Sequence, residues 1–221
     1  MTPSSTSGSR IGPSSPGTTE VIPDRLATAA FEAPEAPFLL SGRAVVTYGE
    51  ADDRVARMAG GLAEAGIRAG DRVAVWGGND VATSLCLLAA LRLGAVAVPI
   101  NTRVRAEEAR RQADAAGVAL WVGAGGPVPG IPMDDLDGPH VAAGERPERE
   151  EALVVFTSGT TGSSKGVRLS RGAVDASARA SAEFLSHRRS DRWLAVLPVF
   201  HVGGIGVLLR SALVGGSVRL V

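Results

Sequence analysis

Apolar runs of strand length alternate along most of this chain with longer segments whose apolar residues recur at helical spacing. The runs predict a short strand and turn at 43–50, and strands at 72–77, 95–99, 118–122, 152–156, 192–198 and 217–221. Helical spacing predicts helices at 50–65, 80–94, 105–116, 172–187 and 205–213. Strands that alternate with helices of about 10–15 residues are typical of a mostly parallel sheet flanked by helices. We therefore expect an α/β fold.

Two segments lack this alternation. Residues 1–23 are rich in Ser, Pro, Thr and Gly and lack the apolar core of a signal peptide, so we expect a disordered tail. Residues 123–150 are rich in Gly, Pro and acidic side chains, which predicts a surface loop with room for one short strand. The remaining chain, 24–221, is expected to fold. Its last strand, 217–221, is expected to expose an unpaired apolar edge.

The composition limits the classes of protein to which this chain can belong. Lys plus Arg equal Asp plus Glu at 23 each, so no global charge favours nucleic acid or an anionic membrane. No apolar run reaches the roughly 18–20 residues that span a bilayer. Cys86 is the only cysteine, which excludes an intramolecular disulfide and fits a reducing cytoplasm. It lies in an apolar predicted helix, where we expect core packing rather than nucleophilic chemistry.

The stretch TSGTTGSSKG, residues 157–166, is either a flexible linker or a loop that binds phosphate. The apolar strand at 152–156 runs directly into it, which favours a positioned loop. Loops at the carboxyl ends of strands are also where α/β sheets bind ligands. Glycines let backbone N–H groups approach an anion, and hydroxyls and an ammonium group add donors. These residues are Thr157, Ser158, Gly159, Thr160, Thr161, Gly162, Lys165 and Gly166.

A Walker phosphate loop does not fit this stretch. That motif needs Gly before its Lys and Ser or Thr after it, whereas Lys165 lies between Ser164 and Gly166. Lys165 is nevertheless the only lysine among the 23 basic residues. Because this lysine lies in the one loop suited to anions, its compact ammonium group on a flexible side chain is expected to contact phosphate.

The longer stretch FTSGTTGSSKGVRLS closely resembles the phosphate-loop signature of the AMP-forming adenylating enzymes, which include acyl-CoA synthetases, luciferases and peptide-synthetase adenylation domains. Ser164 stands where that family usually has proline. Segments 45–79 and 89–108 resemble earlier blocks of the same family, so the resemblance covers residues 24–221. It implies an incomplete N-terminal domain of an adenylate-forming enzyme, without the C-terminal part of the family fold.

The resemblance also implies an activity. Family members join a carboxylic acid to ATP, release pyrophosphate and pass the acyl group to coenzyme A, with Mg²⁺ accompanying ATP. The loop would bind the β- and γ-phosphates, with Lys165 and Thr161 as the residues that act in catalysis. Within the family, residues 191–221 are most similar to the o-succinylbenzoate–CoA ligases of menaquinone biosynthesis.

Residues 197–218 bear on the acid substrate. Amino-acid-activating members carry an Asp soon after the residue matching Phe200, but His201 follows here, which implies an acyl or aryl acid. His201 is either a packing histidine or part of the wall of the acyl pocket, together with Gly203 and Gly204. Four arginines and two further histidines are expected to be exposed to solvent: Arg110, Arg111, Arg188, Arg189, His140 and His187.

Several family elements do not occur in this sequence. The adenine-contacting aromatic-Gly-x-Thr-Glu segment, the ribose-binding Asp, the hinge and the C-terminal catalytic Lys are all missing, and Lys165 is the only lysine. We therefore expect that the chain does not catalyse the complete ligase reaction on its own. It is either part of a ligase that a further C-terminal polypeptide completes, as in a truncated or split enzyme, or a non-catalytic module that binds nucleotide or phosphate.

Overall fold

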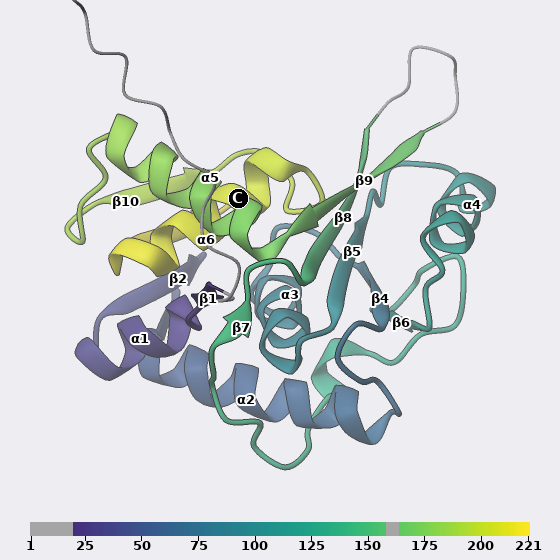
Figure 1. Ribbon diagram of the computed structural model, residues 1–221, viewed down its shortest axis with the longest axis horizontal. Helices are drawn as coiled ribbons and strands as arrows, with labels where there is room; N and C mark the ends of the chain where they lie inside the picture. Colours follow the sequence, from purple (N-terminus) through teal and green to yellow (C-terminus); the bar gives the residue numbers. More distant parts are fainter. Residues whose placement is uncertain (1–19, 158–163) are drawn as a thin grey trace, which may run out of the picture.

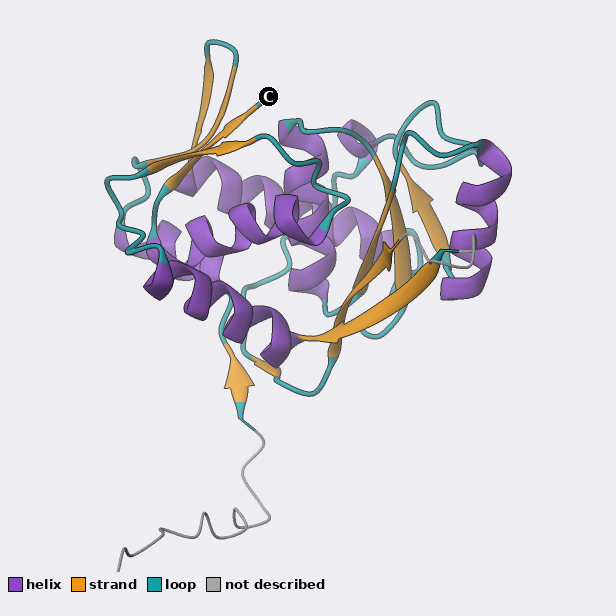
Figure 2. Cartoon of the chain, turned by 90° about the horizontal axis from the view of Figure 1, so that it is seen from above, coloured by secondary structure: helices purple, strands orange, loops and turns teal. Residues whose placement is uncertain are grey.

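Two β-sheets enclose a layer of helices in the computed structural model, which describes residues 20–157 and 164–221. Figure 2 shows this arrangement from above. The larger sheet has the strand order β6-β4-β5-β8-β9 and is parallel except for the β8–β9 pair. Its strands are β4 Arg72–Trp76, β5 Val96–Ile100, β6 Leu120–Val122, β8 Glu151–Thr157 and β9 Lys165–Ser170. The expected α/β class is confirmed.

The smaller sheet has the order β10-β11-β2-β3. Its strands are β2 Pro37–Ser41, β3 Ala44–Thr47, β10 Arg192–Ala195 and β11 Ser217–Leu220. Strand β11 is parallel to β10 on one side and to β2 on the other. The expected unpaired edge at 217–221 is therefore wrong, because β2, which the sequence pattern did not reveal, supplies the second neighbour.

Most of the helices lie between the two sheets, whereas α4 covers the outer face of the larger sheet (Figures 1 and 2). The helices are α1 Arg25–Glu32, α2 Tyr48–Glu64, α3 Val81–Leu93, α4 Ala106–Ala116, α5 Arg171–Phe184 and α6 Val202–Val214. The boundaries of α3 follow from its sequence. The Asp80 side chain accepts the Thr83 N–H at 2.8 Å, and Gly94 ends the helix at φ +86°.

The long connection after β6 contains little regular structure, as expected. It holds the 3₁₀ turn Met133–Asp135 and the strand β7, Arg146–Pro147. Strand β7 pairs antiparallel with β1, Val21–Ile22. Residues 21–22 thus belong to the fold, although the predicted tail extended to residue 23; residues 1–19 of that tail lie outside the described residues.

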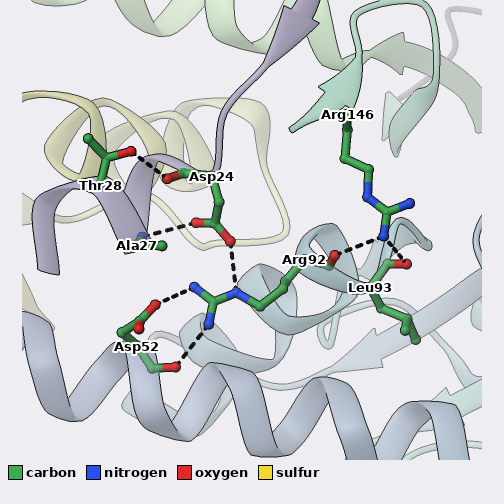
Figure 3. Close-up of polar contacts among 7 residues, drawn as sticks. All are labelled: Asp24, Ala27, Thr28, Asp52, Arg92, Leu93 and Arg146. Atoms are coloured by element: carbon green, nitrogen blue, oxygen red, sulfur yellow. Dashed lines mark hydrogen bonds and ion pairs between the residues drawn. The ribbon is translucent and has the colours of Figure 1, made fainter. Parts of the chain in front are cut away.

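An arginine lies at the junction of three helices in the core. The Arg92 side chain is only 1% exposed, and it forms ion pairs with Asp24 at the start of α1 and Asp52 in α2 (Figure 3). Its Nη1 also donates to the Asp52 carbonyl at 3.0 Å. Burial lowers the pKa of Arg92, but the two carboxylates more than offset this effect and hold it above its usual value. The charge is therefore retained and links α1, α2 and α3.

Two expectations about histidines have different outcomes. His140 is exposed as expected, with Nε2 3.2 Å from an Asp53 oxygen. His187 is buried, so its expected exposure is wrong. Its ring meets the Trp193 ring edge-on at 5.4 Å, and the Arg210 guanidinium lies 4.2 Å from the same indole. Burial and then the charge of Arg210 lower the pKa of His187.

The four arginines that were expected to be exposed are exposed. Arg110 and Arg111 lie on α4, whereas Arg188 and Arg189 lie in the connection after α5 rather than on a helix face. Within the described ranges, no helix is long and apolar enough to cross a membrane.

Cys86 should resist thiol reagents while the protein is folded. It is fully buried in α3, and burial raises the pKa of its thiol to about 12. Because the thiolate is the reactive species, we expect native-state labelling to be on the order of a thousandfold slower than labelling of an unperturbed thiol at mildly alkaline pH. A colorimetric disulfide reagent with and without denaturant measures this. Rapid stoichiometric labelling of the native chain would show that α3 is not packed as described.

Candidate functional site

The stretch from 157 to 166 connects two paired strands, so it is not a free linker. Thr157 at the end of β8 pairs with Lys165 at the start of β9. The Thr157 hydroxyl donates to the Lys165 carbonyl at 3.5 Å. Figure 1 shows β8 and β9 side by side, next to β5. The remaining candidates Ser158, Gly159, Thr160, Thr161 and Gly162 lie outside the described residues.

The hairpin leaves the sheet at the edge where three parallel strands end. Strands β4, β5 and β8 run in the same direction, so their carboxyl ends share one edge, where α/β proteins bind ligands. The Thr157 and Lys165 side chains are exposed there. The exposed Lys165 ammonium group can therefore meet an anion in front of this edge, and the Thr157 hydroxyl can do so if it gives up its long hydrogen bond to the Lys165 carbonyl.

Helix α4 holds the start of β9 through a contact that the sequence did not reveal. The Ser164 hydroxyl hydrogen-bonds a Glu108 carboxylate oxygen. The Gln112 amide donates to that hydroxyl at 3.0 Å and to Glu108 at 3.1 Å. The hydrogen bond from Ser164, followed by those from Arg111 and Gln112, lowers the pKa of Glu108 to about 2. Glu108 is therefore ionised at any pH at which the protein is normally handled.

Loss of the Glu108 carboxylate should loosen the base of the hairpin. For Glu108→Ala we expect amide hydrogen exchange at residues 164–166 to rise by about three- to tenfold, the effect of one hydrogen bond. Because the folded pKa lies below the usual value of 4.5, the contact is complete above that value and is lost as pH falls toward 2.

Glu107→Ala is the matched control, since the Glu107 side chain is 79% exposed on the same helix. Exchange measured by mass spectrometry should not change at 164–166 in that variant. Equal exchange in both variants would rule out the anchoring contact.

The second predicted segment forms the start of α6. His201 is the residue before the helix, is exposed, and has its ring 4.9 Å from the Phe200 ring. The ring thus packs against Phe200 while remaining exposed to solvent, which leaves both expected roles of His201 open. Gly203 and Gly204 lie in the first turn of α6. A Cβ on Gly204 would lie 2.0 Å from the Pro198 carbonyl oxygen, so glycine lets the helix begin directly against this turn.

Asn79 connects α6 to the larger sheet. It follows β4, and its amide nitrogen donates to the Ala195 carbonyl at 2.8 Å and the Leu197 carbonyl at 3.1 Å. Its amide oxygen accepts the Val199 N–H at 2.8 Å. The segment that leads into α6 is thereby fixed at the carboxyl end of β4. Strand β4 lies two strands from β8, about 10 Å away. The structure therefore brings both predicted segments to one sheet edge.

No metal centre can be assigned within residues 20–157 and 164–221. No group of three or more His, Cys, Asp or Glu side chains has a suitable arrangement there. Lys165, Thr157 and Gly166 are exposed at this edge, and their ammonium, hydroxyl and backbone groups are of the kinds that bind anions in proteins.

Comparison with protein-family models matches residues 26–221 to the family described as AMP-binding enzyme. Among curated proteins, the 2-succinylbenzoate–CoA ligase of Bacillus cereus strain Q1 is 35% identical over 210 residues. The match covers 91% of this chain and 44% of that ligase. This chain therefore spans less than half the length of the curated relatives that it matches.

Solved structures show the same likeness. The o-succinylbenzoate CoA synthetase of Bacillus subtilis, in complex with the acyl-adenylate intermediate OSB-AMP, superimposes with a TM-score of 0.85 at 29% identity, covering 91% of this chain and 56% of that one. Its complex with ATP and a magnesium ion gives a TM-score of 0.83 at 28% identity, covering 91% and 58%. The N-terminal domain of FACL13 from Mycobacterium tuberculosis gives 0.81 at 28% identity, covering 89% and 56%.

Proposed function

This chain belongs to the AMP-binding enzyme family, and on that premise we propose that it forms the N-terminal part of an acid–CoA ligase. The observation that carries the proposal is the β8–β9 hairpin, which holds Thr157 opposite Lys165 at the carboxyl edge of a parallel sheet. A ligase of this kind activates a carboxylic acid with ATP and then forms a thioester with coenzyme A.

The hairpin would act on the phosphates of ATP. In the first step a carboxylate oxygen forms a bond to the α-phosphorus, and the bond to the β-phosphate oxygen breaks to release pyrophosphate. Lys165 would neutralise negative charge on the β- and γ-phosphates, and Thr157, with Ser158, Thr160 and Thr161, would donate hydrogen bonds. Gly159, Gly162 and Gly166 would let backbone N–H groups approach the phosphates. Mg²⁺ bound with ATP would supply further neutralisation.

The second step would attach coenzyme A. Its thiol would lose its proton to solvent, the sulfur would form a bond to the acyl carbon, the acyl–phosphate bond would break, and AMP would leave. We assign catalytic roles to Lys165 and Thr161, and these roles belong to the first step. Both residues would contact the phosphates while negative charge moves from the α-phosphorus to the departing pyrophosphate.

The acid would lie beside α6. His201, Gly203 and Gly204 are proposed to form part of its pocket, since His201 is exposed at the start of a helix that Asn79 fixes to the same sheet edge. No carboxylate follows Phe200, so the site would lack a partner for an amino group. We propose an aryl or acyl acid, with o-succinylbenzoate as the first candidate because the similar ligases and synthetases carry that name.

The complete reaction would require more than this chain. Because the matched region corresponds to 44% of the Bacillus cereus ligase, we assign the full activity to a protein that also contains the remaining region, in one chain or as a partner polypeptide. The unpaired Cys86 fits a cytoplasmic location for it.

ATP–pyrophosphate exchange tests this function. The chain should be assayed with aryl, acyl and amino acids, both alone and with the C-terminal region of the Bacillus cereus ligase as a second polypeptide. We expect exchange with aryl or acyl acids in the completed protein only. Pyrophosphate binding without exchange in either setting would instead favour a non-catalytic phosphate-binding module.

A further inference from the structure

A cavity of about 90 Å³ lies within the helical layer, between α1, α3, α5, α6 and the short β1–β7 pair. Leu26, Leu88, Leu91, Val174 and Leu209 contribute apolar walls. Ala152, at the start of β8, also lines it. Thr157 lies five residue steps along an extended strand from Ala152, a distance of about 17 Å. The cavity is therefore separate from the candidate phosphate site.

Arginines outnumber carboxylates around this cavity. Its lining includes four arginines and two aspartates, namely Arg25, Arg92, Arg146, Arg171, Asp24 and Asp175. Both aspartates already have partners. Asp24 binds Arg92 Nε at 2.7 Å and accepts the Ala27 N–H at 3.1 Å (Figure 3). Asp175 binds Arg25 Nε at 2.8 Å and a further arginine, outside the cavity, at 2.6 Å.

Arg146 is left without a carboxylate. Within the described ranges no acidic oxygen lies within 4.0 Å of its guanidinium. Its Nη2 donates to the Leu93 carbonyl at 2.8 Å and the Arg92 carbonyl at 3.3 Å, at the end of α3 (Figure 3). These carbonyls carry only the partial negative charge of a helix C-terminus. The positive charge of Arg146 is thus only partly compensated.

Arg171 is also incompletely satisfied. Its side chain is nine-tenths buried, and its Nε lies 3.3 Å from the carboxylate of Glu150, which is 37% exposed. Its Nη2 is buried without a hydrogen-bond partner among the described residues. Burial lowers the pKa of Arg171, the charge of Arg146 reinforces this shift, and Glu150 and the more weakly acting Asp24 oppose it without reversing it. Two neighbouring guanidinium groups therefore share too little negative charge, which is costly in a buried site.

We propose that this cavity is a second binding site, for a small carboxylate with a compact apolar body. The carboxylate would lie against the guanidinium groups of Arg146 and Arg171, and the apolar body against the leucines and Val174. At roughly 10–15 Å³ per water-sized group, the cavity accepts about six to nine non-hydrogen atoms. A short-chain or monocyclic aromatic acid has this size. The proposal does not rest on the function assigned to the hairpin.

Calorimetric titration of the full chain with benzoate tests the site. We expect a Kd on the order of 0.1–1 mM, as for other ligands of this size, and at least tenfold weaker binding of the neutral analogue benzamide. Arg146→Gln and Arg171→Gln should each weaken benzoate binding by about tenfold or more. Arg149→Gln is the matched control, because that nearby side chain is 89% exposed. It should bind benzoate like the wild type, and so should Lys165→Ala.

A third variant keeps the test decisive if an arginine variant fails to fold. Ala178 on α5 lines the cavity, and Ala178→Leu would fill it without removing a charge. Loss of benzoate binding in this variant supports the site. The proposal is overturned if the folded wild type does not bind benzoate at millimolar concentration, or if it binds benzamide equally well. It is also overturned if benzoate binding survives Ala178→Leu, or if binding is lost only in Lys165→Ala. Tighter binding of inorganic phosphate than of benzoate would likewise overturn the assigned ligand class.

Discussion

Replacing Arg92 by methionine should lower the free energy of unfolding by about 3 kcal/mol, the lower end of the range for breaking a buried ion pair. Arg92 is 1% exposed, and its removal would leave Asp24 and Asp52 without their shared partner. The two carboxylates are 16% and 34% exposed, so water would relieve part of the penalty. The contacts among α1, α2 and α3 would weaken together.

Urea unfolding followed by far-ultraviolet circular dichroism measures this change. Arg57→Met is the matched control, since Arg57 also pairs with two aspartates but is 41% exposed on the surface of α2. Its unfolding midpoint should stay close to that of the wild type, because exposed ion pairs contribute little. Similar losses in the two variants would mean that the buried junction has no special role in stability.

Replacing Lys165 by alanine should weaken pyrophosphate binding by about 10- to 100-fold, the effect of one charge-assisted hydrogen bond. Lys165 is exposed at the start of β9, so the variant should keep the stability of the wild type. Lys165→Arg should recover only part of the affinity, because a planar guanidinium does not replace a compact ammonium at a close phosphate contact.

Arg168→Ala provides the control for this experiment. Arg168 lies on the same strand and is 69% exposed, but it pairs with Glu151 at the other end of the hairpin. Calorimetric titration with pyrophosphate should give the wild-type affinity for this variant. Unchanged binding in Lys165→Ala would remove the role assigned to the ammonium group.

Local patterns in the sequence were sufficient to predict many of the helices and strands. The period of apolar residues predicted α3, β4 and β5 because these elements lie in the core, and Asp80 and Gly94 marked the ends of α3 by capping. The pattern missed α1, which has only eight residues, and β2, which begins at a proline. It also missed β9, whose first residues belong to the Gly- and Ser-rich stretch and are exposed. Short or exposed elements carry too little periodic signal.

Features that depend on distant contacts were not predictable. His187 follows a charged helix end and reads as exposed, yet Trp193 and Arg210 from other elements enclose it. The position of β11 inside its sheet depends on pairing with β2, far earlier in the chain. A period of two or 3.6 residues reports which face is buried, but it does not identify the neighbour.

In the candidate site, too, residues recognisable from local sequence were predicted and those that act through distant contacts were not. Thr157 and Lys165 were identified from residue types that suit phosphate, next to an apolar strand. Glu108 and Asn79 were missed, because the first acts on Ser164 and the second on Val199, across long separations in sequence. Ser164 in place of the usual proline was the one available signal, since it introduces a hydroxyl, but nothing in the sequence shows that α4 accepts its hydrogen bond.

Amide chemical-shift mapping with magnesium pyrophosphate determines whether the β8–β9 hairpin binds phosphate. With an isotope-labelled full chain, we predict saturable shifts within residues 157–166, including Thr157, Lys165 and Gly166, and no shifts at the cavity around Arg146 and Arg171. Titration curves from the hairpin should yield one Kd. If the chain is folded and the amides of 157–166 do not shift, the hairpin does not bind phosphate, whether or not amides elsewhere in the chain respond to pyrophosphate.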